Sequence, residues 1–235
     1  MSPKFIRQAS RFHKILGLVI GLQILFWMAS GLYFTIFPIE NIRGDHLRAE
    51  MDHGVLEPEQ VTISVQDAMD RSGIWGFRAE LDMFLGKPVW QISNSHETVL
   101  VDATSGEKLS PLPEAVARSV VTQGVPGLAR EGGSYFLMTE NAPREYGGRL
   151  PVWVFETESS GERAYVDPST GDIRAVRTTE WRIFDVFWRF HIMDITGKDV
   201  IATWWMKIAA FLGLSLTIAG FIILFQRLIR RRLFS

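Results

Sequence analysis

The hydrophobic pattern of this 235-residue chain is dominated by two long apolar runs near its ends. Residues 15–37 contain no charged side chain, and a helix of that length spans about 30 Å of hydrocarbon. The second run, residues 201–225, contains one charge, Lys207, close enough to the run's end for its ammonium group to reach water. The first run is longer than the roughly 7–15 apolar residues of a signal peptide. We therefore predict two uncleaved transmembrane helices, 15–37 and 201–225.

The segment between these runs changes to a helix followed by short strand-like runs, and this order occurs twice. In the first unit, residues 60–111, we predict a helix with Ser64 as its N-cap, then strands at Phe77–Phe84, Pro88–Ser93 and Thr98–Val101. In the second unit, residues 112–178, we predict a helix opened by Pro113, then strands at Tyr135–Met138, Leu150–Glu156 and Ala164–Val166.

Two matched motifs relate the units to each other. Pro88-Val89-Trp90 matches Pro151-Val152-Trp153, and the turn from Asp102 to Gly106 matches the turn from Asp167 to Gly171 at nearly the same offset. The second unit is longer, and we place its insertion at Thr139–Gly148. The pattern predicts an α+β domain of two related units, each a helix with an antiparallel sheet.

Residues 179–195 follow the second unit with a helical pattern, whereas residues 38–59 form a polar connector after the first span. One face of the 179–195 segment is aromatic and the opposite face is charged: Trp181, Phe184, Trp188 and His191 against Arg182, Asp185 and Arg189. We predict an amphipathic helix that lies on the outer surface of the lipid bilayer.

Basic residues cluster at both ends of the chain. Residues 1–14 and 226–235 each carry four Lys or Arg and no acid. By the positive-inside rule both termini are cytoplasmic and the domain between the spans lies outside. We therefore expect a protein of the bacterial inner membrane with a periplasmic domain. All 26 acidic residues lie between the basic ends, with only 17 basic residues, and this excess argues against a nucleic-acid partner.

Cysteine is absent from the sequence. Its absence excludes disulfides, cysteine-ligated zinc, iron–sulfur clusters, thiol catalysis and the covalent attachment of c-type haem. We find no nucleophile elbow, zincin motif or phosphate-binding loop. The turns at Asp102 and Asp167 gather oxygen atoms but are too short for an EF-hand, and local hydrogen bonds to the backbone explain them.

The candidate ligands are the five histidines. We expect His96 to be a solvated turn residue. His46 and His53 are seven positions apart and would share a helix face, either as exposed polar residues or as part of a metal site. His13 lies at the cytoplasmic edge of the first span, and His191 lies on the aromatic face of the 179–195 helix. Each of these two is either a ligand or a histidine satisfied by its surroundings.

At this point the sequence resembles a known family. The helix, the strands and the closing V-D-x-x-S/T-G turns are similar to the PepSY domain, here in tandem. Arg11–Gly17 and Phe190-His191 resemble the membrane segments of PepSY-TM proteins. The resemblance implies two transmembrane helices that flank an extracytoplasmic domain of two PepSY-like units. Many members have four or more spans, whereas this sequence predicts two.

The resemblance also implies a cofactor. In PepSY-TM proteins that resemble siderophore-associated ferric reductases, membrane histidines at these motif positions are proposed haem ligands, which carries over to His13, His191 and haem b. Our topology places His13 and His191 about 30 Å apart, whereas two nitrogens on one iron lie about 4 Å apart. One chain cannot hold one haem between them. Each site would need a second copy, another membrane subunit, or, for the outer site, His46 or His53.

Three functions stay open, and whether the protein is an enzyme stays open with them. It could be a redox subunit that carries electrons through b-type haem to an acceptor such as a ferric siderophore. It could be a non-catalytic accessory or assembly protein whose periplasmic units bind a peptide, peptidase or transport partner. It could also be a sensor, for which the short tail 226–235 would require an output partner.

Overall fold

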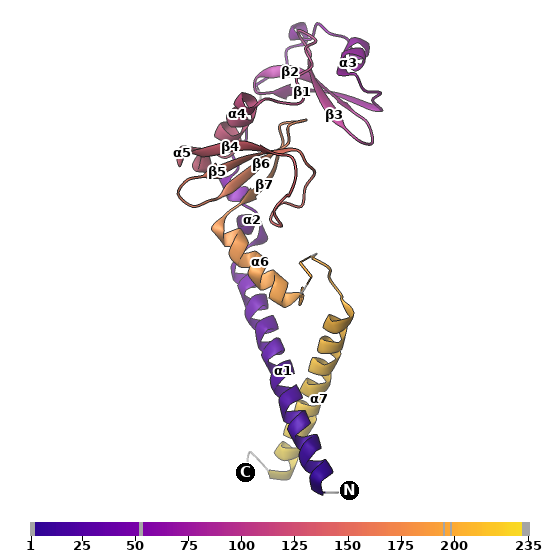
Figure 1. Ribbon diagram of the computed structural model, residues 1–235, viewed down its shortest axis with the longest axis vertical. Helices are drawn as coiled ribbons and strands as arrows, with labels where there is room; N and C mark the ends of the chain where they lie inside the picture. The colour runs from indigo at the N-terminus through magenta and orange to yellow at the C-terminus, as the bar shows by residue number, and fades with distance from the viewer. Residues whose placement is uncertain (1–2, 52–53, 195, 198, 232–235) are drawn as a thin grey trace. The chain divides into compact units, whose positions relative to one another are not determined.

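The computed structural model describes residues 3–51, 54–194, 196–197 and 199–231, with side chains from Arg11 to Phe221 except those of Phe12 and His13. It divides into two compact units (Figure 1). Unit 1 comprises Met1–Pro38 and Ile183–Ser235, and unit 2 comprises Ile39–Arg182. Each unit is described by itself.

Unit 1 is built on two long helices, α1 (Pro3–Ile36) and α7 (Trp204–Arg231), which cross each other (Figure 1). They contain the windows Lys14–Ile36 and Trp204–Phe221, which are long and apolar enough to cross a membrane. Only 11% of each window is buried, whereas a core helix of a soluble protein buries its apolar face. The two helices pack at Gly213, where an added Cβ would lie 3.5 Å from Ile24.

The helix α6 (Thr179–His191) packs the aromatic face of its second half against α1. Ring pairs along the two helices join them, among them Phe184–Phe34, Phe187–Tyr33 and Phe190–Phe26, with centroid distances of 4.9, 4.6 and 5.4 Å. Positions on α1 fall as positions on α6 rise, so the two helices run antiparallel. The helix ends at His191, four residues before the predicted end, and its last turn lies beside the apolar stretch of α1.

The first sheet of unit 2 is antiparallel, in the order β1-β2-β3. Its strands are β1 (Arg78–Phe84), β2 (Lys87–Ser93) and β3 (Thr98–Asp102), and α3 (Val65–Ser72) packs on it through Ala68. Ser64 accepts a hydrogen bond from the Asp67 amide at 3.1 Å, which confirms its predicted role as N-cap. The chain reaches this sheet through α2 (Ile39–Ile42) and two 3₁₀ turns, Asp45–Leu47 and Pro58–Gln60.

The second sheet is also antiparallel, in the order β4-β5-β6-β7. Its strands are β4 (Gly133–Met138), β5 (Val152–Thr157), β6 (Arg163–Val166) and β7 (Ile173–Arg177). The helix α4 (Glu114–Gly124) buries Ala117, Val120 and Val121 against it, and α5 (Pro126–Arg130) adds Leu128. We did not predict α5 or β7. The strand β7 contains two arginines in five residues, which hid its alternating pattern.

The two sheets form the same hydrogen bond at the tryptophan of the matched Pro-Val-Trp motifs. The Trp90 indole donates to the Ile63 carbonyl at 2.9 Å, and the Trp153 indole donates to the Leu112 carbonyl at 2.9 Å. Each acceptor lies just before the helix of its own half: Ile63 precedes the N-cap of α3, and Leu112 precedes the N-cap of α4. The prediction of a mixed α and β protein with two antiparallel sheets and two membrane-length helices is confirmed.

Candidate functional site

The candidate site in unit 1 is centred on His191, at the end of α6. Its Nδ1 lies 2.7 Å from the Ser30 hydroxyl oxygen of α1. Ser30 is fully buried and lies 2.7 Å from the Phe26 carbonyl, an atom that can only accept a hydrogen bond. When Ser30 donates its hydroxyl proton to Phe26, His191 donates from Nδ1 and Nε2 carries a lone pair. In the other tautomer Ser30 donates to Nδ1 and Nε2 carries the proton.

Two aromatic rings form the walls around this imidazole. The Trp188 ring lies nearly parallel to it, 6.5 Å away at 11°, and Phe34 of α1 meets it edge-on at 5.3 Å. The side chain is half-buried. A histidine with one nitrogen held by a hydrogen bond and the other carrying a lone pair has the arrangement of metal-ligating histidines. His191 is therefore hydrogen-bonded by its surroundings, which was one of the two alternatives left open by the sequence. The other alternative, a role as a ligand, stays open.

Two tryptophans from the long helices donate hydrogen bonds to backbone carbonyls at the end of α6. The Trp27 indole of α1 donates to the His191 carbonyl at 2.7 Å, and the Trp205 indole of α7 donates to the Met193 carbonyl at 3.0 Å. The buried Asp194 accepts hydrogen bonds from the amides of Thr196, Gly197 and Asp199. Backbone groups beside lipid require such partners, because no water is there to replace them.

The depth of the site follows from its contacts with α1. Ser30 lies six residues before Ile36, so His191 is level with a point about 9 Å inside the end of the apolar stretch. His13, the other predicted ligand, lies on the same helix, but its side chain is outside the described residues. The axial distance from His13 to Ser30 is about 25 Å. The fold does not bring the two predicted ligands together.

The remaining histidines form no common site in the described part of the chain. The prediction that His46 and His53 share a helix face is wrong. The 3₁₀ turn that contains His46 ends at Leu47, and the backbone then becomes extended. His53 itself lies outside the described residues. His96 is exposed in the β2–β3 hairpin, as predicted, with its amide bonded to Asn94. Within the described ranges, no three acidic or histidine residues gather as a metal site.

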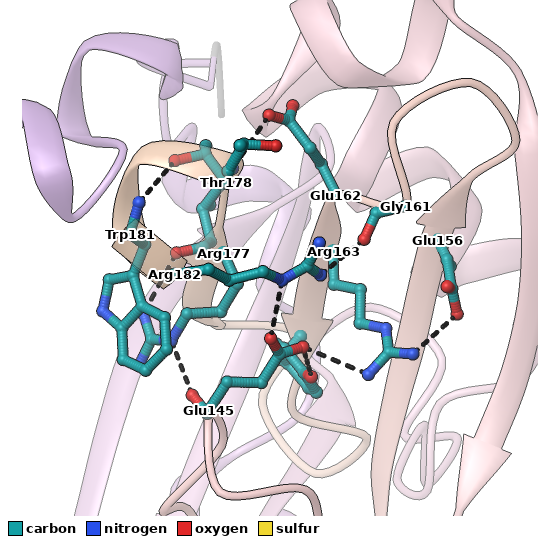
Figure 2. Close-up of polar contacts among 12 residues, drawn as sticks. Glu145, Glu156, Gly161, Glu162, Arg163, Arg177, Thr178, Trp181 and Arg182 are labelled. Atoms are coloured by element: carbon teal, nitrogen blue, oxygen red, sulfur yellow. Dashed lines mark hydrogen bonds and ion pairs between the residues drawn. The ribbon is translucent and has the colours of Figure 1, made fainter. Parts of the chain in front are cut away.

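A second polar cluster, in unit 2, is centred on Glu145 (Figure 2). The residue lies in the long β4–β5 loop, the place of the predicted insertion. Arg163 and Tyr165 bind one carboxylate oxygen at 3.1 and 2.8 Å, and Arg182 binds the other at 3.1 Å. Arg182 also donates to the Gly161 carbonyl at 2.6 Å, and Arg177 donates to the Glu145 carbonyl at 2.6 Å. Sequence analysis missed this cluster, since its members are scattered over loop, strand and helix.

The electrostatics of this cluster favour an ionised Glu145. Burial alone would raise the pKa of its carboxyl, but the hydrogen bonds from Tyr165 and Arg182 and the nearby guanidinium charges outweigh burial and lower the pKa. Burial and the hydrogen bond to Glu145 raise the pKa of Tyr165. A general acid or base near neutral pH needs the opposite shift of its carboxyl pKa. The cluster therefore acts as a structural brace for the loop.

The two aspartate turns are likewise explained by their own backbone. Asp102 accepts from the amides of Thr104 and Ser105 at 2.8 Å, and Asp167 accepts from the Ser169 amide at 2.7 Å. Asp167 also forms an ion pair with Arg174 at 2.7 Å. These local contacts agree with the turn interpretation.

The two apolar helices with exposed faces, joined to an α+β unit, indicate a membrane protein. A family model described as the PepSY-associated TM region matches residues 73–235, more than half of the chain, and the chain belongs to this family. The match extends from the end of α3 through both sheets, α6 and α7. No curated protein and no solved structure matches the chain.

Proposed function

We propose that this protein is an inner-membrane redox subunit that holds a b-type haem through Nε2 of His191. The observation that supports the proposal is the hydrogen bond between His191 and Ser30, which fixes the imidazole and leaves its second nitrogen available. The basic ends of the chain support an orientation with both termini in the cytoplasm and unit 2 in the periplasm. An extracytoplasmic ferric acceptor, such as a ferric siderophore, would then lie on the side of unit 2.

The residues around His191 fit a histidine that would hold a haem iron. Ser30 orients the imidazole, and Trp188 and Phe34 provide apolar surface that excludes water. A bound haem would supply reversible one-electron transfer between ferric and ferrous iron. His13 is the only other histidine in the segments of unit 1, and it is about 17 helical residues from the level of Ser30. The second ligand would therefore come from another subunit or a second copy of this chain.

The face of α1 that would contact a second copy contains two glycines. Gly17 and Gly21 form a G-x-x-x-G pattern, and no atom lies within 4 Å of a Cβ added at either position. Small residues allow helices to approach closely in lipid. Among the described side chains this face is open, which supports a homo-oligomer as the source of the missing ligand.

The test is the absorption spectrum of the full chain, purified from haem-replete cells, in its oxidised and reduced states. We expect a Soret band and a reduced α band in the wild type, and loss of both in His191→Ala. The matched control is His96→Ala, which removes an exposed turn histidine and should leave the spectrum unchanged. A wild-type preparation with no Soret band would overturn the proposal.

A second candidate is a non-catalytic accessory protein, favoured by the surface of unit 2. Trp75 and Phe77, before β1, are 95% and 86% exposed, and large exposed aromatic residues are typical of contact surfaces. Two chromosomal variants separate the candidates. If His13→Ala with His191→Ala preserves the cellular phenotype while deletion of residues 60–175 abolishes it, the accessory role is supported. Loss of the phenotype in the double histidine variant, with normal protein levels, supports the redox role.

A further inference from the structure

The strand β4 lies at one border of the second sheet of unit 2, and its outer edge is open. Its inner edge pairs with β5 in a continuous antiparallel register. Among the residues that the structure describes, none forms a hydrogen bond with the backbone of the outer edge. Phe136 and Leu137 project to opposite faces of the strand and are 37% and 43% exposed. The edge therefore offers unpaired backbone groups beside apolar side chains.

The border strands of the two sheets differ in charge. The strand β1 has three charged side chains in seven residues, and β7 has two in five. The outer edge of β3 is covered, because Lys108 forms a β-bridge with Val101. The strand β4 reads Gly-Ser-Tyr-Phe-Leu-Met and has no charge. Charges on an edge strand keep it from pairing with another strand, so the uncharged edge of β4 is suited to such pairing.

The hydrogen bonds inside the sheet determine which backbone groups of β4 point outward. The Glu158 amide donates to the Gly132 carbonyl at 3.3 Å, so residues 132 and 158 form a hydrogen-bonded pair. Such pairs alternate along an antiparallel ladder, and the residues between them direct their N–H and C=O groups to the opposite edge. Gly133, Tyr135 and Leu137 therefore present these groups to a further strand.

We propose that β4 pairs with β4 of a second copy of this chain, antiparallel, about a two-fold axis at Tyr135. This register places Leu137 opposite Gly133 of the second copy and Phe136 opposite Ser134 of the second copy, so each large side chain meets a small one. The two Tyr135 rings form an aromatic cross-strand pair, which stabilises antiparallel sheets. The outward backbone groups face each other in this register, and the result is one sheet with four strands from each subunit.

A second copy fits this edge because β4 is complementary to itself. Its small residues come first and its large residues come last, so reversing the strand exchanges small positions with large ones. No like charges meet, since β4 has none. The strand β1 lacks this property, because an antiparallel pair of β1 strands centred on Leu81 would place Glu80 opposite Asp82. Two-fold dimers are also the commonest symmetric assemblies of soluble proteins.

The test uses two single-cysteine variants of the full chain, because the natural sequence contains no cysteine that could form another disulfide. One chain carries Ser134→Cys, and the other carries Phe136→Cys and a different affinity tag. The two chains are co-expressed, and the membranes are oxidised. The two positions would form a non-hydrogen-bonded pair with Cα atoms about 4.5 Å apart, a distance that suits a disulfide. We expect a covalent dimer that contains both tags.

Each variant expressed alone is the matched control. In the proposed register, the two copies of residue 134 are displaced along the strands by two residues, about 7 Å, in addition to the spacing between strands. The same holds for residue 136, and both distances exceed the reach of a disulfide. The co-expressed pair should therefore give about tenfold more covalent dimer than either variant alone.

A second measurement is the dissociation constant of the dimer formed by the full chain in detergent. Phe136→Lys places a charge on the edge of β4 and should weaken the dimer about tenfold. The control Val55→Lys adds the same charge at an apolar residue that is 82% exposed outside β4, and it should leave the constant unchanged. Unfolding midpoints of both variants establish that they fold.

Three results would overturn the proposal: no excess of covalent dimer in the co-expressed pair, a monomeric wild type, or an unchanged dissociation constant in Phe136→Lys. The interface lies within unit 2 and does not depend on haem. The absorption spectrum of the same preparations separates the two ideas. A Soret band without the covalent dimer overturns only this interface, and the covalent dimer without a Soret band overturns only the haem subunit.

Discussion

Nδ1 of His191 lies 2.7 Å from the hydroxyl oxygen of Ser30, and this contact joins the last turn of α6 to the apolar stretch of α1, six residues before the end of that stretch. A serine in a transmembrane helix commonly bonds only to its own backbone. Ser30 does so through the Phe26 carbonyl and also shares a hydrogen bond with Nδ1 of His191. The pair therefore fixes the position of the end of α6 and the orientation of its imidazole.

We expect Ser30→Ala to weaken the attachment of α6 to α1. The variant leaves Nδ1 of His191 without its hydrogen-bond partner, at a cost of about 1 kcal/mol in the free energy of unfolding. The midpoint of thermal unfolding in detergent measures the loss. Ser215→Ala is the matched control, because Ser215 forms the same bond to its own helix, at 2.8 Å to the Phe211 carbonyl. Equal midpoints for the two variants would show that the contact with His191 contributes nothing.

Trp27→Phe should loosen the end of α6. The substitution keeps an aromatic ring but removes the indole donor to the His191 carbonyl, which costs about 1–2 kcal/mol where water cannot replace it. Hydrogen exchange of the amides at residues 188–194 should become faster. Trp204→Phe is the control, since Trp204 is 68% exposed at the start of α7. Exchange at residues 188–194 that stays at the wild-type rate in Trp27→Phe would contradict this prediction.

The sequence was a good guide wherever local pattern and long-range packing agree. The two apolar helices, the N-cap at Ser64 and the matched turns at Asp102 and Asp167 all follow from short-range chemistry, and the structure contains them. The strand β7 was missed because its two arginines find partners outside the strand: Arg174 pairs with Asp167 of the preceding turn, and Arg177 donates to the carbonyl of Glu145, 32 positions away. Pattern alone cannot predict such ion pairs.

The candidate site was predictable only in part, for a similar reason. The aromatic face of α6 indicated that His191 lies among rings, and Trp188 and Phe34 surround it. Nothing in the spacing pointed to Ser30 as its partner, since the two are 161 positions apart. The Glu145 cluster had no sequence signal either, because its loop has no regular period. Tertiary contacts, rather than propensity, determine both sites.

Trp90→Phe and Trp153→Phe should have similar effects, because the two residues occupy equivalent places in the repeated halves of unit 2. Each variant loses one hydrogen bond of 2.9 Å to the carbonyl before a helix, at a cost of about 1 kcal/mol in the free energy of unfolding. The two side chains pack in separate hydrophobic clusters, so the double variant should lose about the sum. Urea unfolding measures all three. Opposite or strongly unequal effects would contradict the equivalence of the two halves.

Glu145→Gln should destabilise unit 2, and the loss should depend on pH. The neutral amide weakens the bonds from Arg163, Tyr165 and Arg182, at a cost of about 1.5–3 kcal/mol at pH 7. The folded state lowers the pKa of Glu145 below its ordinary value. A carboxyl with a lowered folded pKa contributes its stability above the unfolded pKa of about 4.3 and loses it as pH falls through the folded pKa.

The difference in unfolding free energy between wild type and Glu145→Gln should therefore stay constant from pH 7 to about pH 5 and shrink below about pH 4.3. Urea unfolding at a series of pH values gives this difference directly. Glu158→Gln is the control, because Glu158 is exposed and its carboxylate has no hydrogen bond or ion pair among the described residues. A difference that grows as pH falls would mean that Glu145 is protonated more readily in the folded state, which would reverse the sign of its electrostatic role.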